Sequence, residues 1–209
     1  MTQNKEYFRG KNTKDHWEHK HTQQYEVNKP YNYDKLDDLH YLKVSNDIIN
    51  LNHTVIELKT VLDVGCAVGA ALNLFQLSTP QLAYTGYDFS QIAVDAANTK
   101  LPNITFECRD ILENPIDKEF GIITFLETIE HIEEGTNYKI LDNILDHCEY
   151  AIVTTVDTED DCWGEHISHY KINTFNEKGY EVVWKSKLTP INMPTGLFHY
   201  IGFLIKGNL

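Results

Sequence analysis

A buried, β-branched segment that runs straight into small residues limits most strongly what this chain can fold into. The segment from Val61 to Gly69 reads VLDVGCAVG, and a helical pattern follows it. A tight turn at the end of a strand needs glycine's freedom in φ, and missing side chains let a ligand approach the backbone closely. The segment therefore predicts a strand, a ligand-binding turn and a helix of an α/β protein.

The same alternation of apolar runs and helical patterns continues downstream, which is typical of a parallel sheet with crossover helices. No long helical pattern separates the last two runs, so we expect that pair to be antiparallel. The expected strands of this seven-stranded α/β domain are Thr60–Gly65, Leu82–Tyr87, Ile104–Cys108, Gly121–Leu126, Tyr150–Val156, Tyr180–Trp184 and Tyr200–Ile205.

Helical patterns fill the gaps between these runs. Ser90 is the expected N-cap of a helix over Gln91–Lys100. Leu36–Leu58 has helical character with an expected break near Asn50–His53. Another helix is expected where apolar residues form one face, at Ile140, Leu141, Ile144, Leu145 and Cys148.

The length of 209 residues fits one substantial core better than two. Met1 to Pro30 is polar and lacks periodicity, so we expect residues 1–35 to form an arm or lid beside a domain over 36–209. Irregular spacing predicts that its histidines, His16, His19 and His21, lie on an exposed arm rather than in a metal site. The aromatic residues expected in the lid are Tyr7, Phe8, Trp17, Tyr25, Tyr31 and Tyr33.

Net charge and the pattern of apolar residues limit the classes of partner that the chain is expected to bind. The formal net charge of -13 disfavours nucleic acid, because nucleic-acid binders usually present a basic patch. No signal-peptide pattern or membrane-length apolar run is present, so we expect a soluble, cytoplasmic protein without a membrane partner. Its four cysteines lie far apart and are expected to be reduced thiols, and the oligomeric state does not follow from the sequence.

Three strand ends supply candidate cofactor ligands. After the first strand, Asp63 and the turn of Gly65, Cys66, Ala67 and Gly69 suit the methionine end of S-adenosylmethionine (SAM), whose zwitterion has no pyrophosphate to cradle. A second strand ends at Asp88, about 20 residues after the turn, where a carboxylate can accept both ribose hydroxyls. Packing or bonding to the cofactor is also expected of Phe89, Asp110, Ile111 and Leu126.

These residues resemble the ordered motifs of the class I SAM-dependent methyltransferases, from about Thr60 onwards. The family's Asp-x-Gly-x-Gly-x-Gly motif corresponds to Asp63 to Gly69, with Ala67 at a position where glycine is frequent. Alanine there predicts a negative φ. The resemblance implies a Rossmann-like, mostly parallel sheet with helices on both faces and an antiparallel last strand. A nicotinamide-dependent dehydrogenase is disfavoured, because the Gly-x-Gly-x-x-Gly spacing is absent.

A cluster of acidic residues and a histidine follows the fourth strand. If this segment turns helical, Glu127, Glu130 and His131 share one face. His131, oriented by a carboxylate such as Glu130, can then serve as general base toward a substrate hydroxyl. Alternatively, Glu127, Glu130 and His131 bind a divalent cation that lowers the pKa of the hydroxyl.

The Glu-x-x-Glu-His pattern is similar to that of ubiquinone-biosynthesis O-methyltransferases and of small-RNA 3'-terminal 2'-O-methyltransferases, both linked to a divalent metal. The loop after the fifth strand adds Trp163, His166, His169 and Tyr170 as an expected substrate pocket. The resemblance implies that either His166 or His169 takes a catalytic or metal-binding role. The alternative is that one of them caps a helix near Asn173.

Together these features predict an enzyme that uses SAM to methylate an oxygen of a small polar molecule, such as a sugar, phenol or related metabolite. One alternative is an RNA 3'-terminal 2'-O-methyltransferase with a divalent metal, which the net charge disfavours. A second alternative is a SAM-binding sensor or partner subunit without catalysis, which would not need the Glu and His cluster.

Overall fold

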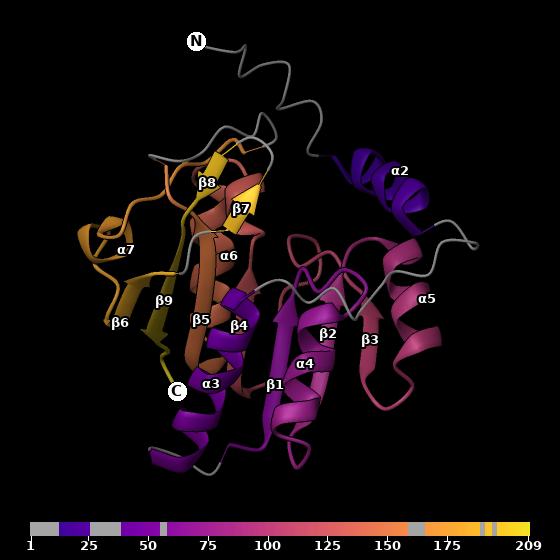
Figure 1. The fold of residues 1–209 in the computed structure, drawn as a ribbon, viewed down its shortest axis with the longest axis horizontal. Coiled ribbons are helices and arrows are strands. Elements are labelled where there is room, and N and C mark those ends of the chain that lie inside the picture. The colour runs from indigo at the N-terminus through magenta and orange to yellow at the C-terminus, as the bar shows by residue number, and fades with distance from the viewer. Residues whose placement is uncertain (1–12, 26–38, 55–57, 159–165, 189–190, 194–195) are drawn as a thin grey trace.

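A seven-stranded sheet forms the centre of the molecule (Figure 1). The computed structural model describes residues 13–25, 39–54, 58–158, 166–188, 191–193 and 196–209. The strand order is β3-β2-β1-β4-β5-β9-β6, with parallel pairs up to β5 and antiparallel pairs on both sides of β9. The strands are β1 (Thr60–Val64), β2 (Ala83–Asp88), β3 (Thr105–Cys108), β4 (Phe120–Leu126), β5 (Cys148–Val156), β6 (Val182–Lys187) and β9 (Tyr200–Lys206).

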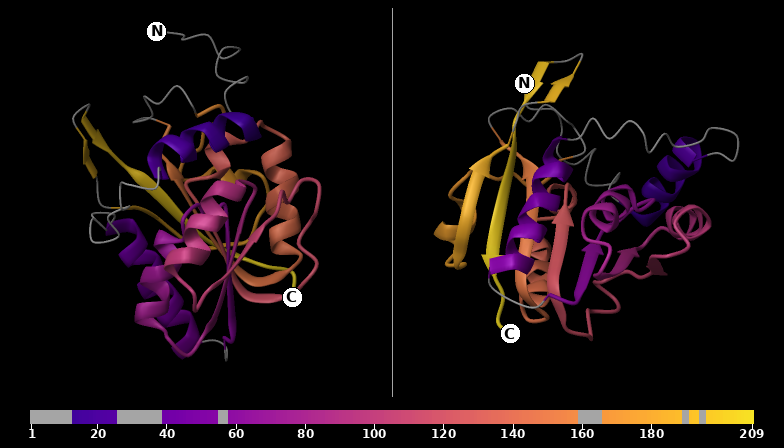
Figure 2. Two further views of the ribbon diagram at one scale, coloured as in Figure 1. Left: turned by 90° about the vertical axis from the view of Figure 1, so that its right-hand side faces the viewer. Right: turned by 60° about the horizontal axis from the view of Figure 1, so that its bottom comes forward.

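Helices cover both faces of this sheet (Figures 1 and 2). One core layer packs α3 (Leu39–Thr54), α4 (Ala70–Ser78) and α5 (Gln91–Lys100) against one face, where Val61 and Ile122 are fully buried. The other layer packs α6 (Thr136–Leu145) and α7 (Thr174–Glu177) against the opposite face. The predicted Rossmann-like sheet with an antiparallel last strand is therefore confirmed.

Local sequence signals explain several element boundaries. Ser90 caps α5 as expected, because its side chain accepts a hydrogen bond from the Ala93 amide. The predicted apolar face of α6 is buried at Ile140, Leu141, Ile144 and Leu145, but Cys148, expected on the same face, begins β5. A capping residue therefore determined where α5 begins, and hydrophobic period determined which face of α6 packs.

Three features differ from the sequence predictions. The expected break near Asn50–His53 is wrong, because α3 continues to Thr54 and the buried Ile48 and Leu51 extend its apolar face across those polar residues. The sixth strand runs to Lys187, beyond the expected end at Trp184, because its polar residues pair with β9. A hairpin of β7 (Ile191–Met193) and β8 (Gly196–Phe198) was not predicted.

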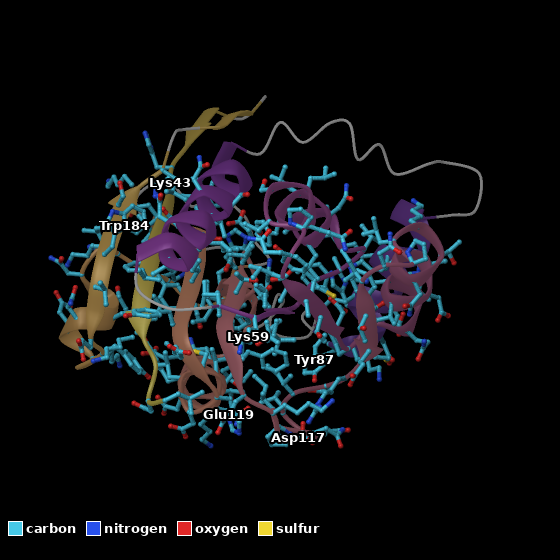
Figure 3. All side chains as sticks on the ribbon, turned by 90° about the horizontal axis from the view of Figure 1, so that it is seen from below. Lys43, Lys59, Tyr87, Asp117, Glu119 and Trp184 are labelled. Atoms are coloured by element: carbon cyan, nitrogen blue, oxygen red, sulfur yellow. The ribbon has the colours of Figure 1, made fainter. Side chains whose placement is uncertain are left out.

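The amino-terminal half of α3 is also tied to the far edge of the sheet. Lys43 Nζ lies 3.8 Å from the centroid of the Trp184 ring on β6, and the two side chains meet in Figure 3. Asp47, one turn further along, accepts a hydrogen bond from the same ammonium group at 2.6 Å. A cation over an indole face contributes about 0.5–1 kcal/mol where exposed, so this contact helps to hold α3 on the sheet.

The helix α2 (Lys14–Tyr25) lies above the carboxyl ends of the strands, beside α5 (Figure 1). Its sequence, KDHWEHKHTQQY, has no apolar face, so the hydrophobic pattern did not predict a helix there. Among the residues that the structure describes, no helix combines the length and apolarity needed to span a membrane.

Candidate active site

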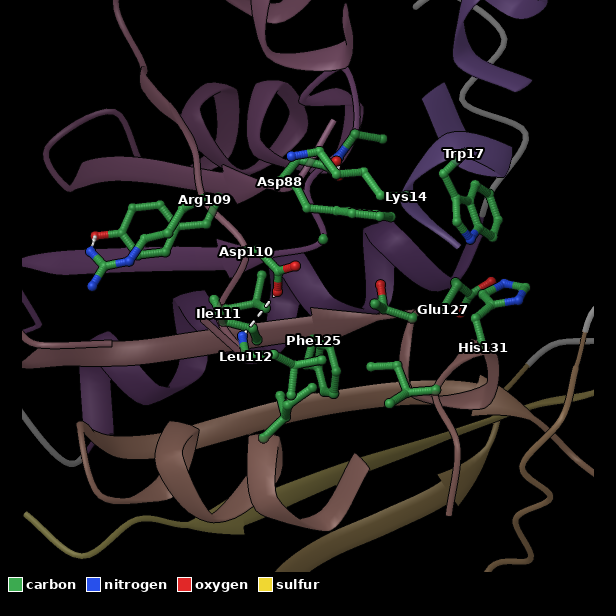
Figure 4. Close-up of a pocket in the computed structure, with 18 of the residues that line it drawn as sticks. Lys14, Trp17, Asp88, Arg109, Asp110, Ile111, Leu112, Phe125, Glu127 and His131 are labelled. Atoms are coloured by element: carbon green, nitrogen blue, oxygen red, sulfur yellow. Dashed lines mark hydrogen bonds between the residues drawn. The ribbon is translucent and has the colours of Figure 1, made fainter. Parts of the chain in front are cut away.

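A cavity of about 570 Å³ opens at the carboxyl ends of β1, β2 and β4, beneath α2 (Figure 4). This position is the topological switch point, where open α/β sheets bind ligands. We call one side the glycine half, lined by Gly65, Ala67, Asp88, Phe89, Asp110 and Ile111. We call the other side the histidine half, lined by Trp17, His21, Glu127, Thr128, His131 and Ile167.

The turn after β1 has the backbone that the small residues predicted. Gly65 has a φ of 76°, and a Cβ there would lie 2.5 Å from the Thr128 hydroxyl oxygen, so only glycine fits. Ala67 has a φ of 46°, so the expectation of a negative φ was wrong. Its amide donates to a carboxylate oxygen of Asp88 at 2.9 Å, which holds the alanine in this left-handed conformation.

Asp88 is the centre of the glycine half. Its second carboxylate oxygen accepts a hydrogen bond from the Ser90 amide at 2.8 Å, and only 5% of the residue is exposed. Burial raises the pKa of Asp88 to about 6, against the lowering effect of these two amide hydrogen bonds. The two amides thus orient the carboxylate toward the place predicted for a ribose, and burial removes most of its water.

Asp63 supports this turn from below and does not line the cavity. Its carboxylate accepts a hydrogen bond from the Thr124 hydroxyl on β4 at 2.7 Å. Burial raises the pKa of Asp63 to about 7, and the nearby charge of Asp88 adds to that rise. Cys66 and Gly69 also lie outside the lining and shape the turn, Gly69 as the N-cap of α4.

The remaining predicted residues of the glycine half lie where the sequence placed them. Phe89, Asp110, Ile111 and Leu126 all line the cavity. Asp110 accepts a hydrogen bond from the Leu112 amide at 3.0 Å, which turns the chain so that Leu112 also faces the cavity. Leu112 is a lining residue that the sequence analysis did not name.

The predicted helical face of Glu127, Glu130 and His131 does not form. Glu127 has a φ of 51°, and only a short 3-10 turn, η1 (Ile129–His131), follows it. The Glu127 amide donates to the Thr154 carbonyl at 3.0 Å, and its carboxylate accepts from the Thr154 hydroxyl at 2.8 Å. These bonds to β5 fix Glu127 at the cavity wall, separate from Glu130.

Glu130, His131 and His166 instead form the cluster that the structure brings together. Each offers a ligand atom, and these atoms lie within 4.8 Å of one another. The rings of His131 and His166 meet edge to face with centroids 4.8 Å apart. Glu130 is buried and accepts a hydrogen bond from the Thr155 hydroxyl at 3.0 Å. One carboxylate and two imidazoles suit either proton transfer or a divalent transition metal.

A buried polar network holds the His166 segment against η1. The amides of Ile167 and Ser168 both donate to the Glu130 carbonyl, at 2.9 and 3.0 Å. Asn137 on α6 donates to the Ser168 hydroxyl at 3.2 Å and also bonds the Tyr170 hydroxyl. The structure therefore builds this part of the site from segments about 30 residues apart, a distance that local patterns do not predict.

Three of the four residues expected in a substrate pocket after β5 lie outside the cavity lining, namely His166, His169 and Tyr170. Tyr170 is 1% exposed and packs on Phe175 in the core, so the prediction that it lines a pocket was wrong. His169 is exposed and lies outside the cavity lining. Trp163 lies outside the described residues.

The helix α2 closes the cavity from above. Lys14, Trp17 and His21 line it, and the Trp17 ring meets His131 edge to face at 4.9 Å between centroids. His21 is 5% exposed, so the expectation of an exposed histidine arm was wrong at this position. Burial lowers the pKa of His21 to about 4. The side chain of Tyr25 and the other expected lid aromatics lie outside the described residues.

The sheet order and the cavity at its switch point define the fold of the class I SAM-dependent methyltransferases. Residues 61–150 match the family model described as a methyltransferase domain. The matched region spans the glycine half and η1.

Part of the chain is also similar to a viral protein. A putative methyltransferase, 235L of Invertebrate iridescent virus 6, is 30% identical over 91 residues, or 44% of this chain. That match spans only 34% of the viral protein's length.

Solved structures extend the likeness to nearly the whole chain. The N-methyltransferase NodS from Bradyrhizobium japonicum WM9, in complex with S-adenosyl-l-homocysteine (SAH), superposes with a TM-score of 0.69 at 15% identity, covering 91% of this chain and 98% of NodS. The plantazolicin methyltransferase BpumL in complex with SAH has a TM-score of 0.64 at 16% identity, covering 97% and 98%. At such identities the likeness shows the fold.

Proposed function

We propose that this protein transfers a methyl group from SAM to an oxygen of a small polar molecule, such as a sugar, a phenol or a related metabolite. The observation that carries the proposal is one cavity whose glycine half suits the cofactor and whose histidine half adjoins Glu130, His131 and His166. The volume, about 570 Å³, lies within the range of about 300–1,000 Å³ found for small-ligand sites.

The residues of the glycine half fit SAM. Gly65 and Ala67 line the cavity with little or no side chain, so the backbone of the turn can lie close to a ligand. Asp88 presents a buried carboxylate that would accept the ribose hydroxyls, while Phe89 and Ile111 would pack on the adenine. The presence of SAH in NodS and BpumL supports the same cofactor here.

The histidine half would then bind the methyl acceptor and take its proton. When bound, SAM supplies an electrophilic methyl group on a sulfonium sulfur. The acceptor oxygen forms a bond to the methyl carbon as the carbon–sulfur bond breaks, and His131 takes the hydroxyl proton and later releases it to water. Glu130 and His166 would orient and stabilise the His131 imidazolium, because their ligand atoms lie within 4.8 Å of it.

A divalent cation is a second version of the same chemistry. Glu130, His131 and His166 would hold the ion, with His166 in the place that the sequence gave to Glu127. The ion would lower the pKa of the acceptor hydroxyl, whose proton would then pass to solvent water rather than to a protein base. The two-histidine, one-carboxylate donor set favours a transition metal over calcium or magnesium.

A small acceptor is favoured over RNA by the charge around the cavity. Glu127 and Glu133 line it, and the whole chain carries a formal net charge of -13. A phosphate backbone would be repelled by this wall, since nucleic-acid sites depend on neutralising phosphates. A role as a SAM sensor would leave the His131 and His166 pair without a task.

Transfer of label from methyl-labelled SAM tests the proposal. The protein is incubated in parallel with a metabolite extract freed of macromolecules and with total RNA, and label is expected among the small molecules. His131→Ala should lower transfer by about 10²-fold or more, as for a lost general base. His169→Ala is the matched control, because His169 is exposed and outside the cavity, and it should retain transfer.

Other outcomes have distinct meanings. Label in RNA alone would establish the 2'-O-methyltransferase alternative, and tight SAH binding without transfer to either pool would establish the sensor. Loss of transfer on chelation, restored by added zinc or manganese, would select the metal version over His131 as base.

A further inference from the structure

Two sides of α2 meet two different parts of the molecule. Trp17 and His21 face the histidine half of the cavity, while Glu18 reaches α5 beside Asp88. We infer that Glu18 is a positioning residue that fastens α2 to the N-terminus of α5 and so makes Trp17 a specificity-determining wall of the acceptor site. This inference rests on the proposed methyl transfer and adds a residue outside the matched methyltransferase domain.

The Glu18 carboxylate makes a two-pronged contact. One oxygen accepts a hydrogen bond from the Gln91 amide at 2.9 Å, and the other accepts from the Ser90 hydroxyl at 2.9 Å. The Gln91 amide is among the first N–H groups of α5, which have no partner within the helix. A carboxylate at this place is also favoured by the helix dipole. The contact joins residues 72 and 73 positions apart.

This contact determines where the rings of α2 stand. Trp17 precedes Glu18 in the helix and places its ring 4.9 Å from that of His131 and 5.9 Å from that of His21, measured between centroids. Figure 4 shows Trp17 and His131 together on one side of the cavity, opposite Asp110. The acceptor site therefore has one wall from the strand ends and one from α2, and it is complete only while α2 is docked.

The same contact connects the acceptor wall to the cofactor. Ser90 donates its amide hydrogen to Asp88 and its hydroxyl hydrogen to Glu18, so two carboxylates flank one residue. Their mutual repulsion raises the free energy of the docked helix. Ribose hydroxyls that donate to Asp88 would offset this repulsion, so bound cofactor favours docked α2. Lys14 and Trp17 in turn line the cavity above the cofactor place and would slow its release.

Glu18→Ala tests the inference in the full-length protein without any acceptor. SAH is the probe, and its dissociation rate is measured by competition with excess SAM. Diethyl pyrocarbonate, which acylates accessible imidazoles, then reports the exposure of His131 by mass spectrometry. We expect the loss of two charged hydrogen bonds to raise both rates by about five- to tenfold.

Asp15→Ala provides the matched control, because Asp15 is an exposed acidic residue on the same helix. Both rates should stay at wild-type values in this variant, and acylation of the exposed His169 should not change in either. Unchanged rates in Glu18→Ala, or an equal rise in Asp15→Ala or at His169, would overturn the inference. Failure of the wild-type protein to bind SAH would instead remove the proposed function.

Discussion

The two halves of the cavity are built in different ways. In the glycine half, the lining residues follow directly on β1, β2 and β3, and short hydrogen bonds such as that from the Ala67 amide to Asp88 join neighbouring strand ends. The histidine half draws on α2, on η1 and on the segment after residue 166, which lie far apart in the chain. Affinity for the cofactor and recognition of the acceptor can therefore change independently.

The largest expected effect is on the affinity for SAH, and it distinguishes the glycine half from the histidine half. Asp88→Ala removes the carboxylate that accepts hydrogen bonds from the Ala67 and Ser90 amides and that is proposed to bind the ribose. The affinity for SAH should therefore fall by about 10²–10³-fold. His131→Ala should leave SAH affinity within a few-fold while lowering transfer by about 10²-fold or more, because His131 lines only the histidine half. Calorimetric titration with SAH measures both variants, and a comparable loss of affinity in the two would mean that the halves are not separate.

A pH series sharpens the picture of the glycine half. The pKa of Asp63 is about 7 in the fold and about 3.8 when exposed, so its contribution to stability is full below the lower value and lost as pH rises through the higher one. Asp63→Asn removes this dependence. From about pH 5 to about pH 8, urea unfolding should show the variant gaining on the order of 3 kcal/mol relative to wild type. A constant difference across that range would show that Asp63 is not protonated in the fold.

A smaller effect, on the free energy of unfolding, is expected when the hydrogen bonds that support the histidine half are removed. Asn137→Ala removes the buried side-chain amide that bonds the hydroxyls of Ser168 and Tyr170, and should lower the free energy of unfolding by about 2 kcal/mol. Lys139→Ala, at an exposed position on the same helix, should change it by less than about 0.5 kcal/mol. If Asn137→Ala also weakened SAH binding, the support would extend into the glycine half.

The sequence predicted most of the fold because hydrophobic period and turn residues act locally. The strand positions, the Ser90 cap and the α6 face all follow from spacing within about ten residues. The same holds for Asp88 and Asp110, which come directly after strands. The helix α2 could not be predicted in this way, because Glu18 and Trp17 stabilise it through contacts with Ser90 and His131 rather than through an apolar face.

The positive φ of Glu127 was equally hidden from local patterns. The shared face of Glu127, Glu130 and His131 depended on a helical turn, but the hydrogen bonds with Thr154 on β5 determine the backbone there. The prediction that His166 or His169 is functional stays a prediction, and the structure brings only His166 to Glu130 and His131.

The two left-handed residues, Ala67 and Glu127, have a consequence for laboratory evolution. Each holds an L-residue at a φ near 50°, which costs on the order of 1 kcal/mol relative to glycine. Selection for heat resistance alone should therefore enrich glycine at position 67, whereas glycine at position 127 would also lose the hydrogen bond from the buried Thr154 hydroxyl. At position 67 such a change deletes one methyl group, whereas at position 127 it deletes a carboxylate from the cavity wall. A second round of selection for methyl transfer would accept the first glycine and reject the other, and so would mark which side chain is retained for chemistry.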